Sequence, residues 1–490
     1  MVNRIEISII FFIYMLLMMC IGVYYYRRTR NMSDYFLGNR KLGAWVTSMS
    51  AEASDMSGWM LMGLPGFAYV AGLNAGWIAL GLALGTWANW YFIAARLRVY
   101  TELANNSLTL PDFFENRFLV SSGKLRVIPA IFILIFFILY TSSGFVAAGR
   151  LFETIFCLPY EMAMLLGAGV VIFYTLVGGF LAVSRTDFIQ GVMMFFAILV
   201  VPIGAAMMLG GFTETAALIY AEHASFFSPL TKADGSSVGF IEWISLMGWG
   251  IGYFGQPHIL VRFMAIRHAD ELPQATRIAM AWVVISLSAA ILVGMVGAVY
   301  LKVPLEGTAA ETVFLAMAGE LFPPIVAGLI LAAVLAAIMS TSSAQLLVAA
   351  SAFAQDIYRR SLRPAAKQSE LVWVSRISVL CIAAAALYLG MRPDHFILDM
   401  VAYAWAGFGA AFGPALLMCL FWRRTTERGV IAGIVTGGLT VLFWKEIGFL
   451  GLYELVPGFL FALLAIYIVS KVDAKPSAEV TALFDRVGQR

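Results

Sequence analysis

A short polar stretch interrupts an apolar segment near the N-terminus of the sequence. Residues 50–59 read SAEASDMSGW, within a segment otherwise apolar enough to cross a lipid bilayer. An ionised side chain at the centre of a bilayer costs roughly 2.5 to 3.5 kcal/mol, so Glu52 and Asp55 are better explained as lining a site than as chance occurrences. The stretch therefore points to a polar site inside a membrane.

A second apolar segment, residues 239–263, is unusually rich in glycine. It contains SLMGWGIGYFGQPH, with Gly250 near its middle and Pro257 close behind. Glycine costs about 1 kcal/mol and proline about 3 kcal/mol within a helix, and proline also leaves a carbonyl without its partner. Because freed backbone groups in lipid must face protein or a cavity, we expect both segments to be interrupted helices. The alternative for the second segment is that its glycines only allow helices to pack closely.

The composition predicts the elements that position these stretches. Hydrophobic residues make up 61% and charged residues 12% of the chain, and the mean hydropathy is +0.86, far from the averages of soluble proteins. We therefore predict an all-α polytopic membrane protein with about 13 transmembrane helices. The expected spans are residues 5–26, 42–72, 73–94, 126–148, 160–183, 187–210, 239–263, 276–300, 321–353, 373–391, 397–422, 429–446 and 452–471.

The two interrupted segments occupy matching places in this series. Spans 42–72 and 239–263 are five apart, so they cross the membrane in opposite directions. Two five-helix units, residues 42–210 and 239–422, would then form an inverted repeat, an arrangement typical of secondary transporters. The other expected parts are an N-terminal span with a cytoplasmic loop, two C-terminal spans and a short cytoplasmic tail, at residues 1–41, 429–471 and 472–490.

Basic residues predict the orientation. With the N-terminus outside, the loops assigned to the cytoplasm collect most of the 32 Lys and Arg residues, and the C-terminus is cytoplasmic. Arg27, Arg28 and Arg30 follow the first apolar run, so we expect a retained span rather than a cleaved signal peptide. The opposite side holds Arg4, Arg150, Lys232, Lys302, Arg392 and Lys445.

An interrupted helix offers backbone groups to ligands of both charges. Amide groups at a helix N-terminus attract an anion, and unpaired carbonyls attract a cation. We therefore expect a substrate carboxylate around Ser57 and Gly58, and a metal cation at the carbonyls near Ala53 and Met56.

Span 321–353 supplies a candidate for the remaining ligands of this cation. It contains LAAVLAAIMSTSSAQ, in which Ala337, Ser340 and Thr341 lie at i, i+3 and i+4 on one helical face. A carbonyl and two hydroxyls can converge there, and such neutral oxygen ligands suit Na+. Small polar residues on a helix face also serve interhelical packing, so the pattern alone leaves both explanations open.

Three aromatic residues near the expected cavity could provide flat apolar walls for a small organic substrate. They are Tyr140, Trp249 and Tyr253, of which the last two flank the glycines of the second segment. Since aromatic residues make up 14% of the chain, contact with lipid is the alternative explanation.

Motifs of several other protein classes are missing from the sequence. Cys20, Cys157, Cys381 and Cys419 have no paired spacing, the histidines lack metal-ligand spacing, and there is no Walker-type glycine loop. We expect no enzymatic activity, and the net charge of +3 is explained by membrane orientation rather than by nucleic-acid binding. A membrane sensor is a further alternative, but no kinase-like extension follows the last span.

Six motifs together resemble the sodium:solute symporter family, and most of all its proline transporters from bacteria. The resemblance runs from about residue 5 to about residue 475 and implies a LeuT-type fold. It also implies sodium-coupled symport of L-proline by alternating access in the bacterial inner membrane, by a protein that works as a monomer. The alternative is a sodium symporter for another small carboxylate, such as pantothenate or a different amino acid. The motifs are SAEASDMSGW, LMGLPG, LTLPDFF, GWGIGYFGQPH, AAIMSTSSAQL and YAWAGFGAAFGP.

The resemblance also implies roles for individual residues. Asp55 and Asp187 resemble acidic positions tied to sodium binding or passage, and Arg40 resembles a position linked to inward ion release. The implied Na+ site uses the carbonyls of Ala53, Met56 and Ala337 and the hydroxyls of Ser340 and Thr341. The implied proline pocket uses Ser57, Gly58, Tyr140, Trp249, Tyr253 and Pro257, bordered by Trp59 and Gln256.

Two positions depart from the family pattern. Glu52 stands where a small residue is usual, so its carboxylate could face a water-filled vestibule or alter ion use, including a proton contribution; we favour the vestibule. Arg185 stands where an aromatic residue is expected, and it could pair with a nearby acid at the cytoplasmic face. Neither departure touches the implied ligand atoms.

Overall fold

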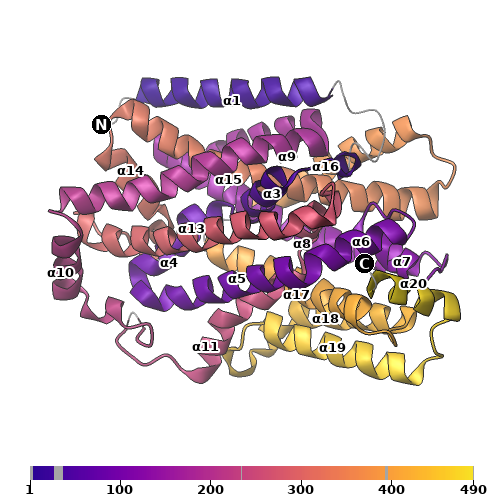
Figure 1. Ribbon diagram of the computed structural model, residues 1–490. Coiled ribbons are helices and arrows are strands. Elements are labelled where there is room, and N and C mark those ends of the chain that lie inside the picture. The colour runs from indigo at the N-terminus through magenta and orange to yellow at the C-terminus, as the bar shows by residue number, and fades with distance from the viewer. Residues whose placement is uncertain (1–3, 27–36, 233, 392–394, 489–490) are drawn as a thin grey trace.

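The computed structural model describes residues 4–26, 37–232, 234–391 and 395–488, and these residues form helices joined by short connections (Figure 1). The α-helices are α1 (Arg4–Tyr26), α3 (Ala44–Asp55), α4 (Leu64–Ala71), α5 (Gly76–Ala88), α6 (Ala95–Leu103), α7 (Leu110–Arg117), α8 (Lys124–Phe156), α9 (Tyr160–Met208), α10 (Phe212–Glu222), α11 (Phe240–Met247), α12 (Pro257–Ala265), α13 (Leu272–Tyr300), α14 (Val313–Leu321), α15 (Pro324–Ser351), α16 (Gln368–Gly390), α17 (Ile397–Phe421), α18 (Glu427–Ile447), α19 (Leu455–Val472) and α20 (Ala478–Gly488).

Short segments of tighter or wider helix connect many of these elements. They are η1 (Gly38–Arg40), η2 (Trp59–Gly63), η3 (Gly72–Ala75), η4 (Asn89–Ala94), η5 (Ala224–Phe227), η6 (Gly248–Gly255), η7 (Ala269–Glu271), η8 (Gly307–Thr312), η9 (Ala352–Leu362) and η10 (Phe449–Gly451). Wider turns within helices are often found at functional sites, and η2 and η4 both lie close to the polar stretch of α3.

Ten helices of the described residues are long and apolar enough to cross a membrane, so the chain is a multi-pass membrane protein. Expected spans 42–72 and 239–263 have no separate counterpart among the ten because each is divided among shorter segments, and the helix at Tyr160–Leu176 is shorter than the rest. Interruption rather than a lack of apolar residues explains the difference, and the count of about 13 stays a prediction.

The helices differ strongly in how far they are covered by protein. In the most apolar stretch of α1 only 28% of the residues are buried, whereas the share is 83% in the corresponding stretches of α15 and α17. Figure 1 accordingly shows α1 along one edge, α18 and α19 along the opposite edge, and α3 in the middle. The helices at the edges face lipid, and the central helices enclose the polar residues.

Both segments for which the sequence predicts an interruption run through this protected centre. Helix α3 ends at Asp55, and Met56 leaves the helical conformation with φ −82° and ψ 85° before η2 begins. Segment η6 is a narrow helix that ends at Gly255, and Gln256, with φ −81° and ψ 104°, is extended before α12 begins. The two segments contact each other through the side chains of Asp55 and Tyr253.

The glycines of η6 also serve close packing, as the alternative explanation required. A Cβ atom at Gly250 would collide with the backbone of Gly81 in α5, and one at Gly252 would collide with the indole ring of Trp405 in α17. The interruption and the close packing therefore occur in the same segment and do not exclude each other.

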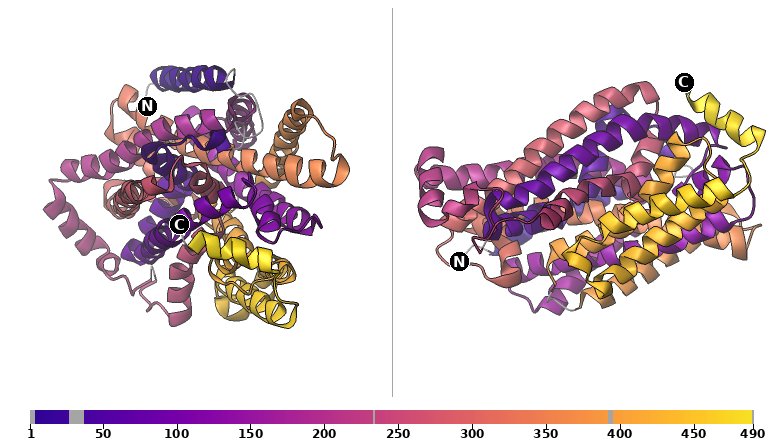
Figure 2. Two further views of the ribbon diagram at one scale, coloured as in Figure 1. Left: turned by 45° about the vertical axis from the view of Figure 1, so that its right-hand side comes forward. Right: turned by 90° about the horizontal axis from the view of Figure 1, so that it is seen from below.

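The first described helix starts, and the last described helix lies, at opposite ends of the bundle. Helix α1 starts at one end, and α20 lies at the other (Figure 2). Which end faces the cytoplasm stays a prediction from the basic residues. Arg27, Arg28, Arg30 and Arg392, which that prediction uses, lie outside the described residues.

Candidate functional site

The carbonyl of Ala53 in the last turn of α3 meets the polar face of α15. The Ser340 hydroxyl donates to this carbonyl over 2.7 Å and is also 3.0 Å from the Ala337 carbonyl, and the Thr341 hydroxyl lies 3.4 Å from the same Ala53 oxygen. All four residues are at most 1% exposed. The hydroxyls of Ser340 and Thr341 could rotate so that their lone pairs, and not their protons, face a ligand. These oxygens would then suit a small cation that has lost its water shell.

The end of α3 is held open by side chains that take the place of helical hydrogen bonds. The indole Nε1 of Trp59 donates to the Asp55 carbonyl over 3.0 Å, and the Met56 amide still bonds the Glu52 carbonyl at 2.8 Å. The Ser57 hydroxyl lies 3.4 Å from the Trp59 amide. Trp59 thus bonds the Asp55 carbonyl at the end of the helix, while the Ala53 carbonyl points toward α15.

Gly58 marks the closest approach of the interrupted segment to its neighbours. A Cβ atom there would lie 2.7 Å from the Cβ of Ala147 in α8 and 3.6 Å from the Cγ1 of Ile338 in α15. A side chain at this position would collide with Ala147 and push the start of the new helical segment away from α8, whereas its contact with Ile338 would be an ordinary one.

A hydrogen bond joins the two interrupted segments. The Tyr253 hydroxyl of η6 donates to the Oδ2 of Asp55 over 2.5 Å, and its ring packs edge-on against Trp405, with centroids 4.9 Å apart. The Trp405 indole in turn donates to the Trp249 carbonyl over 2.8 Å. Trp405, which was not predicted from the sequence, therefore holds two aromatic residues of the predicted pocket, Trp249 and Tyr253.

The other predicted pocket residues lie along η6 and the start of α12, except Tyr140, which belongs to α8. Trp249 stacks on Tyr453 at 5.7 Å and lines a cavity of 470 Å³, whereas Pro257 lines a cavity of only 30 Å³. Tyr140 faces the His258 ring at 5.8 Å. The Gln256 side-chain amide donates to the Gly252 and Trp405 carbonyls, at 3.0 and 3.1 Å.

Two buried polar atoms among the pocket residues have no hydrogen-bond partner in the described part of the chain. They are the hydroxyl of Tyr140 and the Oε1 of Gln256. A buried polar atom without a partner is costly, so a polar ligand that reached either atom would satisfy a group that the protein leaves unpaired.

Asp187 belongs to a buried ion pair. Its Oδ2 accepts from the Ser50 hydroxyl at 2.7 Å and from the Arg262 guanidinium at 3.2 Å. Arg262, fully buried in α12, also donates to the His258 carbonyl at 2.7 Å. Arg262 was not predicted from the sequence, although an arginine five residues after Pro257 in an apolar stretch is a usable signal.

Arg40 closes a loop at one end of the bundle. Its guanidinium donates to the Asn106 side chain and to the carbonyl of Ser107, both at 2.9 Å, and to the Met264 carbonyl. Burial, together with repulsion from Arg98, lowers the pKa of Arg40 to about 10, so it remains charged at neutral pH. Arg40 therefore links the connection after α6 to the end of α12.

The two departures from the family pattern have different outcomes. Glu52 is 2% exposed and its Oε1 accepts from the Trp90 indole at 3.0 Å, so the expectation of a water-filled vestibule is wrong for this conformation. The Oε2 of Glu52 is also buried and has no hydrogen-bond partner among the described residues. Arg185 is exposed and makes no ion pair with any residue that the structure describes, and its suggested pairing with a nearby acid stays a prediction.

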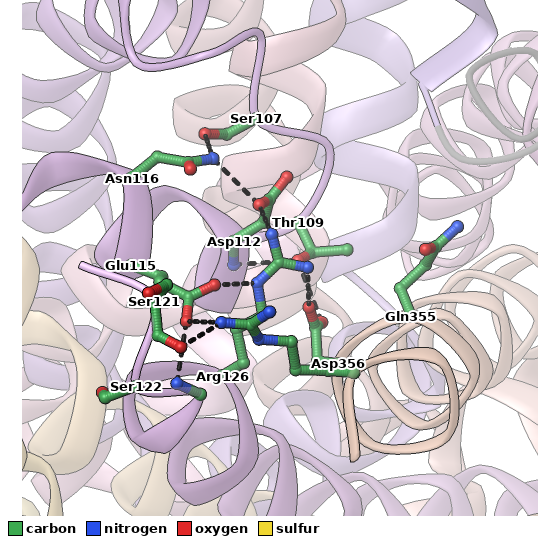
Figure 3. A network of polar contacts seen from close by, with 12 residues as sticks. Ser107, Thr109, Asp112, Glu115, Asn116, Ser121, Ser122, Arg126, Gln355 and Asp356 are labelled. Atoms are coloured by element: carbon green, nitrogen blue, oxygen red, sulfur yellow. Dashed lines mark hydrogen bonds and ion pairs between the residues drawn. The ribbon is translucent and has the colours of Figure 1, made fainter. Parts of the chain in front are cut away.

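A cluster of charged residues ties α7, the start of α8 and η9 together (Figure 3). Arg126 bridges the carboxylates of Asp112, Glu115 and Asp356, the last at 3.6 Å. Asp356, fully buried, also accepts from the Thr109 hydroxyl at 2.9 Å. Local sequence patterns gave no sign of this cluster, because its members come from segments far apart in the chain.

Comparisons with known proteins agree with this architecture. The chain is 47% identical to the sodium/proline symporter of Escherichia coli over 97% of this chain and 94% of that protein. It is also 47% identical to the high-affinity proline transporter PutP of Bacillus subtilis, over 96% and 98% of the two chains.

Solved structures share the fold at much lower identity. A Na+-coupled sialic acid symporter matches with a TM-score of 0.79 and 20% identity, over 96% of this chain and 99% of that chain. This likeness shows the fold, which is of the LeuT type. The model of the sodium:solute symporter family matches residues 35–437. The chain therefore belongs to the sodium:solute symporter family.

Proposed function

We propose that this protein takes up L-proline together with Na+ across the cytoplasmic membrane of a bacterium. Bacterial relatives named as proline transporters, 47% identical over nearly the whole chain, support the substrate and the ion. The single observation that carries the proposal is the convergence of the Ser340 and Thr341 hydroxyls on the Ala53 carbonyl, where α3 stops.

The proposed Na+ site follows from that convergence. It consists of the carbonyls of Ala53, Met56 and Ala337 with the hydroxyls of Ser340 and Thr341. An ion held between α3 and α15 would fix the end of the interrupted helix. Asp55, which is bonded to Tyr253, supplies negative charge close to this site and couples it to η6.

The proposed proline site lies on the other side of the same interruption. Ser57 and Gly58 start the new helical segment and would meet the carboxylate of proline. Trp59, Tyr140, Trp249, Tyr253, Gln256 and Pro257 would surround the ring and the amino group. The unpaired Tyr140 hydroxyl and Gln256 oxygen support this assignment, because each needs a polar partner.

Proline uptake would be coupled to Na+ entry because Na+ binds before proline. Na+ bound from outside would hold α3 against α15 and complete the proline site, and rocking of one bundle would open the other side. One Na+ crossing about 100 mV contributes roughly 2.3 kcal/mol, and a tenfold gradient adds about 1.4 kcal/mol. Together these support accumulation of roughly several hundredfold.

The larger architecture fits alternating access. We infer two five-helix repeats, residues 42–210 and 239–422, whose interrupted members α3–η2 and η6–α12 carry the ligands, within about 13 spans. The N-terminal span, the last two spans and the tail lie outside the repeats. The N-terminus would face outside, the C-terminus the cytoplasm, and a monomer would suffice for transport without enzymatic chemistry.

Arg40 and Asp187 are proposed to act on the cytoplasmic path of the ion. Arg40 bridges the connection after α6 and the end of α12, and the Asp187–Arg262 pair ties α9 to α12 beside Ser50. Ion release to the cytoplasm would then require these contacts to rearrange.

The deciding experiment is uptake into vesicles that contain the purified protein and carry an imposed sodium gradient. We expect accumulation of radiolabelled proline that collapses without the gradient. Pantothenate and other amino acids should be transported much more slowly. Preferential uptake of pantothenate would replace the proposed substrate, and gradient-independent equilibration would remove the coupling.

A further inference from the structure

A cavity of 750 Å³ lies where η4, α6, α13 and α20 meet, apart from the ion and proline sites. Its lining combines arginines with aromatic residues and includes Arg96, Arg277, Tyr91, Phe92, Phe421 and Val487. We propose that this cavity binds the phosphate headgroup of an anionic phospholipid, whose acyl chains lie on the adjoining aromatic surface.

The arginines of the cavity are available for an anion. The Nε of Arg96 is buried without a hydrogen-bond partner in the described part of the chain, and its guanidinium lies 5.1 Å from the ring centres of Phe421 and Phe484. Arg277 is exposed and has no ion pair or hydrogen bond with the described residues. Against these two cations the lining contains one acid, Asp270, so the cavity favours a negative ligand.

The exposed aromatic residues indicate how deep in the membrane the cavity lies. Tyr91 is 64% and Phe92 49% exposed, and Tyr91 stacks on Trp87 with ring centres 5.4 Å apart. Exposed aromatic residues of membrane proteins concentrate at the interface between hydrocarbon and water. Arg96 follows Phe92 by one helical turn, so its guanidinium reaches the level of lipid headgroups.

Apolar walls distinguish a lipid from a free phosphate ion. Phe421 is 46% exposed beside the arginines, and Val487 of α20 closes the opposite wall. A phosphate ion would use only the guanidinium groups, whereas a phospholipid also covers the exposed rings. Basic pockets between helices at a membrane surface bind anionic headgroups in this way.

The test is native mass spectrometry of the purified full-length protein with phosphatidylglycerol and phosphatidylcholine of identical acyl chains. We expect wild type to retain phosphatidylglycerol at least tenfold more strongly than phosphatidylcholine. Arg96→Gln/Arg277→Gln should bind phosphatidylglycerol roughly thirtyfold more weakly, and Arg96→Lys/Arg277→Lys should retain most of the binding because the charge remains.

The matched control is Arg363→Gln/Arg428→Gln, which removes the same charge from exposed ion pairs outside the cavity. Retained phosphatidylglycerol binding in this control, together with the loss in Arg96→Gln/Arg277→Gln, supports the site. An equal loss of binding in the control and in Arg96→Gln/Arg277→Gln overturns it. Inorganic phosphate that displaces phosphatidylglycerol at equal concentration also overturns a lipid site. If the double variant does not fold, Arg277→Gln alone decides: several-fold weaker binding supports the proposal and unchanged binding overturns it.

Discussion

At the scale of single residues, the hydroxyl of Thr341 is the most direct test of the proposed ion site. Thr341→Ala removes one oxygen that points at the Ala53 carbonyl, and one neutral hydrogen-bonding group contributes about 1 kcal/mol. We expect the sodium concentration for half-maximal proline uptake to rise roughly five- to tenfold. Ser343→Ala is the matched control, because its hydroxyl bonds the Ser340 carbonyl within the same helix. Unchanged sodium dependence in Thr341→Ala at normal protein levels would remove this ligand.

The buried ion pair of Asp187 and Arg262 leads to a prediction about stability, also at the scale of single residues. Asp187→Asn leaves a fully buried guanidinium without its counter-ion, which costs about 3 to 5 kcal/mol. We expect a marked fall in the thermal unfolding temperature of the purified protein. Asp187→Asn/Arg262→Gln should recover much of that fall, since no unpaired charge remains. If the double variant is less stable than both single variants, charge pairing is not the reason for the effect.

At the scale of elements, the glycines of η6 hold the second interrupted segment in place. Gly252→Ala inserts a Cβ where the Trp405 indole lies, and overpacking of this kind costs about 1 to 3 kcal/mol. We expect weaker binding of radiolabelled proline, because Trp405 bonds the Trp249 carbonyl and packs on Tyr253. Gly239→Ala is the control, with no atom near its added Cβ. Equal proline binding in both variants would separate η6 from the substrate pocket.

The elements also show what the sequence could and could not predict. The polar stretch in an apolar run predicted where α3 ends, and helical spacing predicted that Ser340 and Thr341 share a face, because both signals are local. Arg262, Trp405 and the partner of Glu52 were not predicted. Each depends on a residue brought close by folding, such as Trp90, which is in a different helix, and no local pattern encodes that contact.

The charged cluster around Arg126 connects these elements to motion of the whole molecule. It ties α7 and the start of α8 to η9, the continuation of α15, and α15 also carries the proposed Na+ ligands. Separation of these helices would open the path from Pro257 past Ser351, which line the same small cavity. We therefore expect the cluster to favour a form of the protein in which these helices stay together.

Arg126→Gln tests that role for the entire transporter. The change leaves the carboxylates of Asp112, Glu115 and Asp356 without their shared cation, so repulsion replaces attraction across the closed side. A shift of about 1.4 kcal/mol toward the open form raises its population roughly tenfold. The test compares Arg126→Gln/Ser351→Cys with Ser351→Cys, both in a background without the four native cysteines. We expect a membrane-impermeable maleimide to label the variant that carries Arg126→Gln several-fold faster. Arg363→Gln, which breaks an exposed pair with Glu370, should leave the labelling rate unchanged. Equal rates in both backgrounds would mean that the cluster supports the fold without controlling access.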